Sequence, residues 1–308
     1  MVSPDSDLSP HRPVMLDEVI DFIKPGKGDI IVDATIGAGG HSCEILKKIQ
    51  PDGLLIGIDK DAEILKIASR FLSKISDSYK LYQADFVNLG CILERLKISK
   101  VNGILLDLGV SSLQLDSLDR GFSFSKEGPL DMRMDRTQGI TAEDLLKRLS
   151  ERDMADIFWK YGEERKSRRV ARAIMQERKN GVAIKTTTQL AKIAERALYV
   201  PSKYSKKRKI HPATRIFQAL RIAVNDELKS VEQFLDDACG FLADGSRIVV
   251  MSFHSLEDRL VKRAFREGKS TSLLEILTKR PLIASDSEIR ENVRSRSAKL
   301  RAAERTYL

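Results

Sequence analysis

The sequence predicts an α/β protein in which a small helical domain is inserted into a parallel sheet with right-handed crossover connections. Four apolar runs, at residues 30–32, 54–58, 79–82 and 101–106, each lead into an aspartate. These aspartates are Asp33, Asp59, Asp85 and Asp107. They are roughly 22 to 26 residues apart, which is the length of a strand plus a crossover helix. A glycine-rich turn follows the first run, and a basic stretch with helical periodicity follows the fourth.

The first predicted strand leads into the stretch on which the rest of the interpretation depends. Residues 33–42 read DATIGAGGHS, with Gly37, Gly39 and Gly40 directly before a helix-forming run. Glycine is needed where a turn requires positive φ or where a ligand approaches the backbone closely. The pattern therefore indicates a nucleotide-type ligand site, with a plain strand-to-helix connection as the alternative.

The ends of the second and third strands indicate the kind of nucleotide. Asp59 ends the second strand about 20 residues after the glycines, where a carboxylate can bind both hydroxyls of a ribose. This geometry suits both NAD and S-adenosylmethionine, so a dehydrogenase is one alternative. Ser42 and Cys43 stand where a dinucleotide fold has its third glycine, and Asp85 with Phe86 offers a carboxylate and a ring for an adenine. Both features favour the methyl donor.

The net charge of +9 over 308 residues is unevenly distributed. Residues 141–220 hold 20 Lys and Arg against 9 Asp and Glu, so the basic excess is local. A local basic excess predicts a polyanion partner such as RNA, with a solvated helical face as the alternative.

Composition excludes several classes of protein. The sequence contains no run of 18 apolar residues, so it predicts no membrane span. The N-terminus lacks the basic flank and apolar core of a secretory signal. We therefore expect a cytoplasmic protein without membrane contact. Cys43, Cys91 and Cys239 are widely spaced, which predicts buried reduced thiols and no metal site. The sequence carries no signal for an oligomeric state.

The helical insertion is expected at residues 136–215, between sheet-domain segments 1–135 and 216–308. Thr141 and Thr188 are plausible helix caps. Basic clusters at 165–169 and 203–209 suit contacts with backbone phosphates. After the insertion the pattern predicts one long helix over 216–241, a fifth strand over 247–253, and a last strand over 294–301 with alternating exposure.

Two polar segments should lie near the ligand because they follow strand ends. Residues 107–135 form a long segment at the carboxyl edge, a common place for function. Phe122 and Phe124 in it are either stacking rings or core residues. His254, after the fifth strand, is either a general base or a residue that holds its loop. Ser255 and Asp258 are expected to cap the following helix.

Together these motifs resemble one known family. The resemblance is carried by residues 32–42 and 105–112, by GFSF at 121–124, by 128–135, by YGEE at 161–164, by HPATR at 211–215, and by 252–259. They occur in matching order in the bacterial RsmH (MraW) family, over nearly the whole chain. A departure is Val293, where the family usually has proline before the Arg-Ser-Arg-Ser run.

The resemblance implies a Rossmann-like class I S-adenosylmethionine-dependent methyltransferase with an inserted all-helical, substrate-binding domain. The implied activity is methylation of N4 of a cytidine in the P-site part of the decoding region of 16S rRNA, within the small ribosomal subunit. S-adenosylhomocysteine is the implied product. The donor-binding positions carry over to Gly39, Gly40, His41, Asp59, Phe86, Asp107 and Gln114.

Asp107 is the candidate catalytic residue. The amine of cytosine is a poor nucleophile, because its lone pair is delocalised into the ring, so an enzyme must hold acceptors against its hydrogens. We expect Asp107 and a backbone carbonyl of residues 108–111 to do this, although the resemblance also places Asp107 beside the donor's methionine part. The alternative is a noncatalytic RNA-binding or assembly factor.

Overall fold

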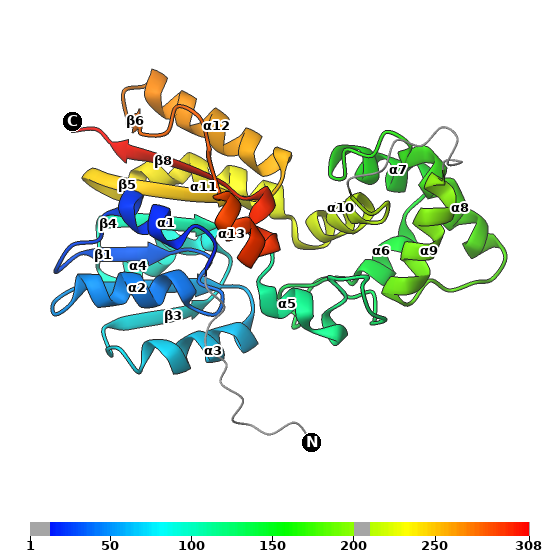
Figure 1. Cartoon of the computed structure of the whole chain (residues 1–308), viewed down its shortest axis with the longest axis horizontal. Helices are drawn as coiled ribbons and strands as arrows, with labels where there is room; N and C mark the ends of the chain where they lie inside the picture. Colours follow the sequence, from blue (N-terminus) through cyan, green and yellow to red (C-terminus); the bar gives the residue numbers. More distant parts are fainter. Residues whose placement is uncertain (1–12, 200–209, 308) are drawn as a thin grey trace. The chain divides into compact units, whose positions relative to one another are not determined.

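The computed structural model describes residues 13–199 and 210–307 and divides into two compact units (Figure 1). The first unit comprises Met1–Ser111 with Leu228–Leu308, and the second is Ser112–Glu227. The second unit is wider than the insertion expected at 136–215, because the segment after Ser111 and the helix before Glu227 pack with it. The predicted basic cluster at 203–209 lies outside the described residues.

The first unit contains an eight-stranded sheet in the order β3-β2-β1-β4-β5-β8-β6, with β7 paired to β8. The first five strands are mutually parallel, and β8 is antiparallel to its neighbours. The α/β prediction is therefore confirmed. The strands are β1 (Ile30–Asp33), β2 (Leu54–Asp59), β3 (Tyr79–Gln83), β4 (Val101–Asp107), β5 (Leu242–Ser252), β6 (Leu274–Ile276), β7 (Leu282–Ile283) and β8 (Lys299–Arg305).

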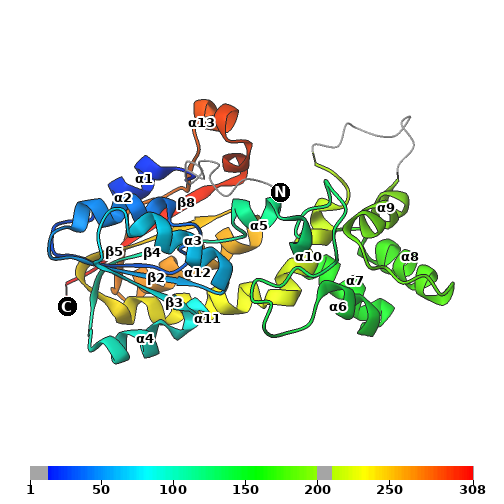
Figure 2. The same cartoon turned by 90° about the horizontal axis from the view of Figure 1, so that it is seen from below.

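Helices cover both faces of this sheet (Figure 2). One face carries α1 (Leu16–Ile23), α2 (Gly40–Ile49) and α3 (Ala62–Leu72). The other carries α4 (Leu89–Leu96), α11 (Glu227–Phe241) and α12 (Ser255–Ser270). Successive residues of a strand point to opposite faces, so Leu105 packs with the first group and Leu106 with the second. Each fully buried aliphatic side chain contributes about 1.5–3 kcal/mol to this packing.

The order of the strands creates a switch point between β1 and β4. From β1 the chain proceeds to β2 and β3 on one side, and it returns to β4 and β5 on the other. Ligands of open α/β sheets bind beyond the carboxyl ends of the strands at such a point. Asp33 and Asp107 end these two strands, so the fold places both carboxylates there.

The second unit is helical, with no strand among its described residues. Its elements are α5 (Ser112–Asp116), the 3₁₀ turn η2 (Leu118–Arg120), α6 (Ala142–Arg148), α7 (Glu151–Lys160), α8 (Ser167–Lys179), α9 (Thr187–Leu198) and α10 (Thr214–Asn225). Thr141 caps α6 in a capping box with Asp144, as expected. The prediction for Thr188 is wrong, because Thr186 caps α9 and Thr188 lies inside the helix.

Two predictions for the last third of the chain are wrong. The single helix over 216–241 is two helices, because Asp226 adopts φ 51° and ends α10 before α11 begins. The strand expected over 294–301 begins only at Lys299, after α13 (Asp286–Glu291) and a 3₁₀ turn, η4 (Val293–Ser297). β8 is largely buried, without alternation, because it lies inside the sheet between β5 and β6.

The cysteines are free thiols, but they do not share one environment. Cys43 is buried, Cys239 is half-buried and Cys91 is exposed, so the expectation of burial is wrong for Cys91. Burial raises the pKa of the Cys43 and Cys239 thiols. Within 13–199 and 210–307, no helix combines the length and apolarity needed to cross a bilayer.

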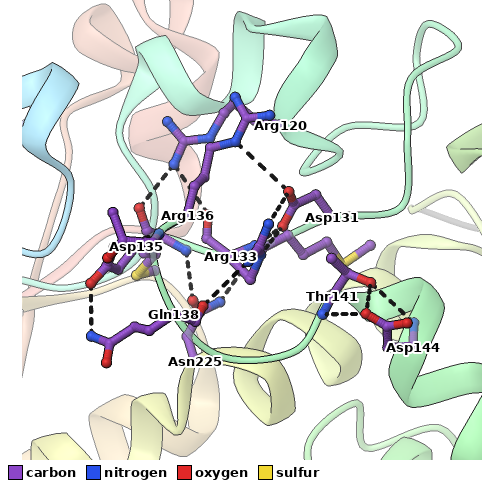
Figure 3. Close-up of polar contacts among 12 residues, drawn as sticks. Arg120, Asp131, Arg133, Asp135, Arg136, Gln138, Thr141, Asp144 and Asn225 are labelled. Carbon is purple, nitrogen blue, oxygen red and sulfur yellow. Dashed lines mark hydrogen bonds and ion pairs between the residues drawn. The ribbon is translucent and has the colours of Figure 1, made fainter.

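A polar network orders the segment between η2 and α6 (Figure 3). The buried guanidinium of Arg120 donates to the carbonyl oxygens of Arg133 and Met134, at 3.1 and 3.0 Å. Arg133 binds Asp131 with two parallel hydrogen bonds of 2.7 and 3.0 Å. Asn225 accepts from the Met134 amide at 2.7 Å, which ties the segment to α10. Side chains thus replace the backbone ladder that a strand would supply.

Gly121, beside this network, tests how tightly the segment is packed. It has φ 73°, and an added Cβ would lie 2.2 Å from the Pro129 carbonyl oxygen. Gly139 has φ 75° with nothing within 4 Å, so it provides a control with the same backbone strain and no clash. We expect Gly139→Ala to lower the free energy of unfolding by about 1 kcal/mol. Gly121→Ala should lower it by about 3 kcal/mol more. Urea titrations of both variants measure the difference, and equal losses would contradict the tight packing.

Candidate active site

The glycine loop connects β1 to α2 in a conformation that requires glycine. Gly37 and Gly39 have φ 51° and 86°, in the region that side chains rarely adopt. A Cβ on Gly40 would lie 3.1 Å from the Pro13 ring. Gly39 precedes α2 and has no side chain that could cap the helix. The N–H groups of the first helical turn can therefore donate hydrogen bonds to a ligand.

Asp59 is fixed against this loop. One carboxylate oxygen accepts a hydrogen bond from the Gly37 amide at 3.0 Å, and the other accepts from the Asp61 amide at 2.9 Å. The end of β2 and the glycine loop therefore form one rigid corner. A carboxylate held in this way is suited to bind a vicinal diol, as the sequence predicts.

Asp33 and Asp107 are two carboxylates at the switch point, of which Asp33 is buried and Asp107 is half-buried. Asp33 is 2% exposed and accepts from the Ser42 hydroxyl at 2.7 Å and the Thr35 amide at 3.2 Å. Burial nevertheless raises the pKa of Asp33 to about 6. The pKa of Asp107 is raised well above its usual range, by burial first and then by the charges of Asp33 and Glu257.

His41 faces Asp107 as a neutral imidazole. Burial lowers the pKa of His41 to about 4. Its Nε2 lies 2.9 Å from the Val14 carbonyl oxygen, which can only accept, so the ring proton is on Nε2. Nδ1 is then an acceptor, 3.7 Å from Oδ2 of Asp107. Oδ1 of Asp107 is buried without a hydrogen-bond partner among the described residues.

This arrangement of acceptors is suited to a cationic hydrogen donor. A neutral imidazole nitrogen and a carboxylate oxygen that face each other repel unless a proton or a donor lies between them. Beside them are the glycine loop and Asp59, on neighbouring strands. The residues therefore fit a ligand with an ammonium group at one end and a ribose further along.

Asp85 and Phe86 follow β3, where the sequence predicts a carboxylate and a ring that contact an adenine. In the structure both side chains contact other residues of the protein. Asp85 caps the 3₁₀ turn η1 (Phe86–Asn88), and its carboxylate pairs with Lys60 at 2.7 Å and accepts from Ser230 at 2.8 Å. Protein donors thus already occupy the carboxylate expected to bind adenine. Phe86 is half-buried and packs edge-to-face on Phe234, with ring centroids 5.3 Å apart. Its part in adenine binding stays a prediction.

Gln114 and the two phenylalanines belong to the second unit. The Gln114 side chain is buried in α5, and its role toward the donor stays a prediction. Phe122 is buried beneath the guanidinium of Arg120, which favours the core interpretation. Phe124 is half-buried and stacks on His211, with ring centroids 4.5 Å apart.

His254 holds its loop and caps a helix. Its Nδ1 accepts from the Glu257 amide, and the Glu257 carboxylate accepts from the His254 amide, which forms a capping box at the start of α12. The expectation that Ser255 and Asp258 cap this helix is therefore wrong. Asp258 instead pairs with Arg301 at 2.7 Å and Lys299 at 3.3 Å.

Sequence reasoning did not single out Thr35 as a site residue. Its hydroxyl lies 2.6 Å from the Asp107 amide, which donates to it, and so joins the glycine loop to the end of β4. Ser42 was noted only as a replacement for a glycine, yet its hydroxyl binds Asp33. The available signal was the position of both residues beside the glycines, directly after a strand end.

Comparisons with known proteins agree with this geometry. The model of the MraW methylase family matches residues 8–306. Ribosomal RNA small subunit methyltransferase H of Thermotoga neapolitana is 50% identical over 296 residues, which cover 96% of this chain and 95% of that protein. Proteins of the same name are similar in Geotalea uraniireducens, with 47% identity over 96% and 98% of the two chains, and in Acaryochloris marina, with 45% identity over 100% and 98%.

The raised pKa of Asp33 predicts a pH-dependent stability. A folded-state pKa near 6 exceeds the ordinary value, so the folded protein binds the proton more tightly than the unfolded chain. The free energy of unfolding should therefore fall as pH rises from about 4 through 6, by about 3 kcal/mol at ~1.4 kcal/mol per pKa unit. Urea titrations across this range measure the fall. In Asp33→Asn the part of the fall that Asp33 contributes should disappear, while the part due to the raised pKa of Asp107 remains. An unchanged profile would contradict the assignment to Asp33.

Proposed function

The chain belongs to the MraW methylase family, and on that premise we propose that it methylates N4 of a cytidine in the P-site part of the decoding region of 16S rRNA. The methyl donor is S-adenosyl-L-methionine. The relatives are named as methyltransferases of small-subunit ribosomal RNA, which supports the class of substrate. The observation that carries the proposal is Asp107 beside the glycine loop, whose buried Oδ1 has no hydrogen-bond partner in the part of the chain that the structure describes. Family membership also makes the dehydrogenase alternative wrong.

The donor-binding residues are proposed from their places around the crevice. The backbone at Gly39 and Gly40 lies against the donor, and Asp59 binds its ribose hydroxyls. His41 and Asp107 accept hydrogen bonds from its ammonium group. Phe86 packs on the adenine, and Gln114 is a further donor-binding residue. When bound, the donor supplies an electrophilic methyl group on a sulfonium sulfur.

Asp107 acts on the cytosine amine. Its Oδ1, together with a backbone carbonyl of residues 108–111, accepts hydrogen bonds from the amine and lets the nitrogen pyramidalise. As the nitrogen–methyl bond forms, the carbon–sulfur bond breaks and its electron pair stays on sulfur. The nitrogen then loses one proton. The raised pKa of Asp107 makes its carboxylate a better acceptor for that proton than an ordinary aspartate.

The helical unit is proposed to bind the RNA backbone. Around the start of α8 it exposes a row of cations on one short stretch: Arg165, Lys166, Arg168, Arg169 and Arg172. Such cations neutralise phosphates and release counterions, which gives affinity without sequence preference. The choice of nucleotide then depends on the crevice of the first unit.

Methyl transfer to isolated ribosomal subunits tests the proposal. Small subunits that lack the modification are incubated with labelled S-adenosylmethionine, and the rRNA is digested to nucleosides. We expect the label in N4-methylcytidine. Label in another nucleoside would contradict the proposed target. Donor binding without transfer to subunits or naked 16S rRNA would contradict the proposed substrate, and the absence of donor binding would overturn the site itself.

Asp107→Asn tests the catalytic role. The substitution keeps the shape and one acceptor, but it removes the negative charge and the proton acceptor. We expect turnover to fall by about 100-fold or more. Donor affinity, measured by calorimetry, separates the two roles of Asp107, because a purely donor-binding carboxylate would lose affinity and recover turnover at saturating donor. Near-normal turnover with intact donor binding would reject the assignment.

A further inference from the structure

The Arg-Ser run near the C-terminus is a structured turn that the activity described so far does not use. We propose that η4 (Val293–Ser297) is a phosphate-binding clamp for the rRNA strand that carries the target cytidine, with Arg294 and Arg296 as the binding side chains. The inference rests on the proposed function, since it assigns the RNA contact of the first unit.

The register of the sheet places this turn at the edge where the reaction occurs. Asp107 of β4 pairs with Met251 of β5, and the next residue, Ser252, pairs with Lys299, the first residue of β8. η4 ends at Ser297, and only Ala298 separates it from β8. Because β8 runs antiparallel to β5, its start lies at the carboxyl ends of β4 and β5 (Figure 1). The turn thus borders the same edge as Asp107.

Internal hydrogen bonds fix the shape of the turn. The Asn292 side chain accepts from the Arg294 amide at 3.1 Å. The fully buried Ser295 donates from its hydroxyl to the Asn292 carbonyl at 2.7 Å. With Ser295 anchored inward, the residues on either side, Arg294 and Arg296, are exposed. A turn built in this way loses little conformational entropy when it binds a ligand.

The basic residues near η4 differ in their surroundings. No acidic residue occurs from 292 to 301, while four basic residues do. Lys299 and Arg301 point to the same internal carboxylate, Asp258. Arg294 and Arg296 face solvent, and Arg296 makes no ion pair with any residue in 13–199 or 210–307. A guanidinium can bind phosphate with two parallel hydrogen bonds, so two exposed arginines on either side of Ser295 suit a nucleic-acid backbone.

A short chain of hydrogen bonds connects this region to the reactive crevice. Glu288 of α13, just before the turn, accepts from the Met15 amide at 2.8 Å. Val14 comes directly before Met15 in the chain, and its carbonyl oxygen accepts a hydrogen bond from the His41 ring. His41 in turn faces Asp107. A phosphate bound at η4 would therefore be held in a fixed relation to Asp107, because every link lies in the same compact unit.

Paired substitutions test the clamp. The first double variant, Arg294→Gln with Arg296→Gln (the glutamine pair), removes both positive charges. The second, Arg294→Lys with Arg296→Lys (the lysine pair), keeps both charges. The matched control is Lys48→Gln with Arg95→Gln, two exposed cations at the ends of α2 and α4, at the opposite edge of the sheet. Methyl transfer is measured with small ribosomal subunits that lack the modification, at several salt concentrations. Donor affinity is measured by calorimetry.

For the glutamine pair at η4, we expect the KM for subunits to rise about tenfold and the slope of log KM against log salt to decrease by about 1.5, as for two lost phosphate contacts. Donor affinity should be unchanged. The lysine pair should keep the salt slope of the wild type, because it keeps both charges, but it should lose part of the affinity that the bidentate guanidinium contacts supply. A glutamine pair that behaves like the control overturns the clamp while leaving the proposed function intact. If the wild-type protein does not methylate subunits, the proposed function itself is contradicted.

Discussion

The structure depends on two carboxylates, one buried and one half-buried, that lie side by side where the order of the strands reverses. Asp33 and Asp107 end adjacent strands, and the negative charge of Asp33 adds to the cost of ionising Asp107. Ser42 and Thr35 compensate only Asp33, which leaves Oδ1 of Asp107 buried and unpartnered among the described residues. Such a group lowers the stability of the free protein. A ligand that donates a hydrogen bond to this oxygen would recover that cost, so a feature that is unfavourable for folding favours binding.

Local patterns predicted the elements that depend on local signals. Strands β1 to β4 and the glycine loop could be predicted from the apolar runs, the aspartates that follow them and the glycines. Both strand periodicity and positive φ depend on residues that are neighbours in the sequence. The break at Asp226 carries no such signal, since helical periodicity continues through it. The burial of β8 also could not be read from its sequence. Charged residues such as Arg301 and Glu304 enter the sheet because partners far along the chain, Asp258 and Arg247, neutralise them.

The candidate site was predictable by residue type but not by role. The four aspartates at strand ends look equivalent in the sequence, yet their surroundings differ. Asp85 is neutralised by Lys60, Asp59 is fixed by backbone amides, and Asp33 binds Ser42. Only Asp107 keeps a buried oxygen without a protein partner among the described residues. These differences arise from residues that the fold brings together, so they require the structure.

Affinity for RNA and alignment of one base place different demands on a protein. A row of cations such as that at the start of α8 draws a polyanion from any direction, because the interaction is long-ranged and does not depend on sequence. Methyl transfer instead requires the amine to be held within a fraction of an ångström of its line of attack. Phosphate contacts that set this register are most effective on the rigid body that carries the reacting groups, since any motion between bodies would reduce alignment. The place of η4, in the same unit as Asp107 and at the same edge of its sheet, meets that demand.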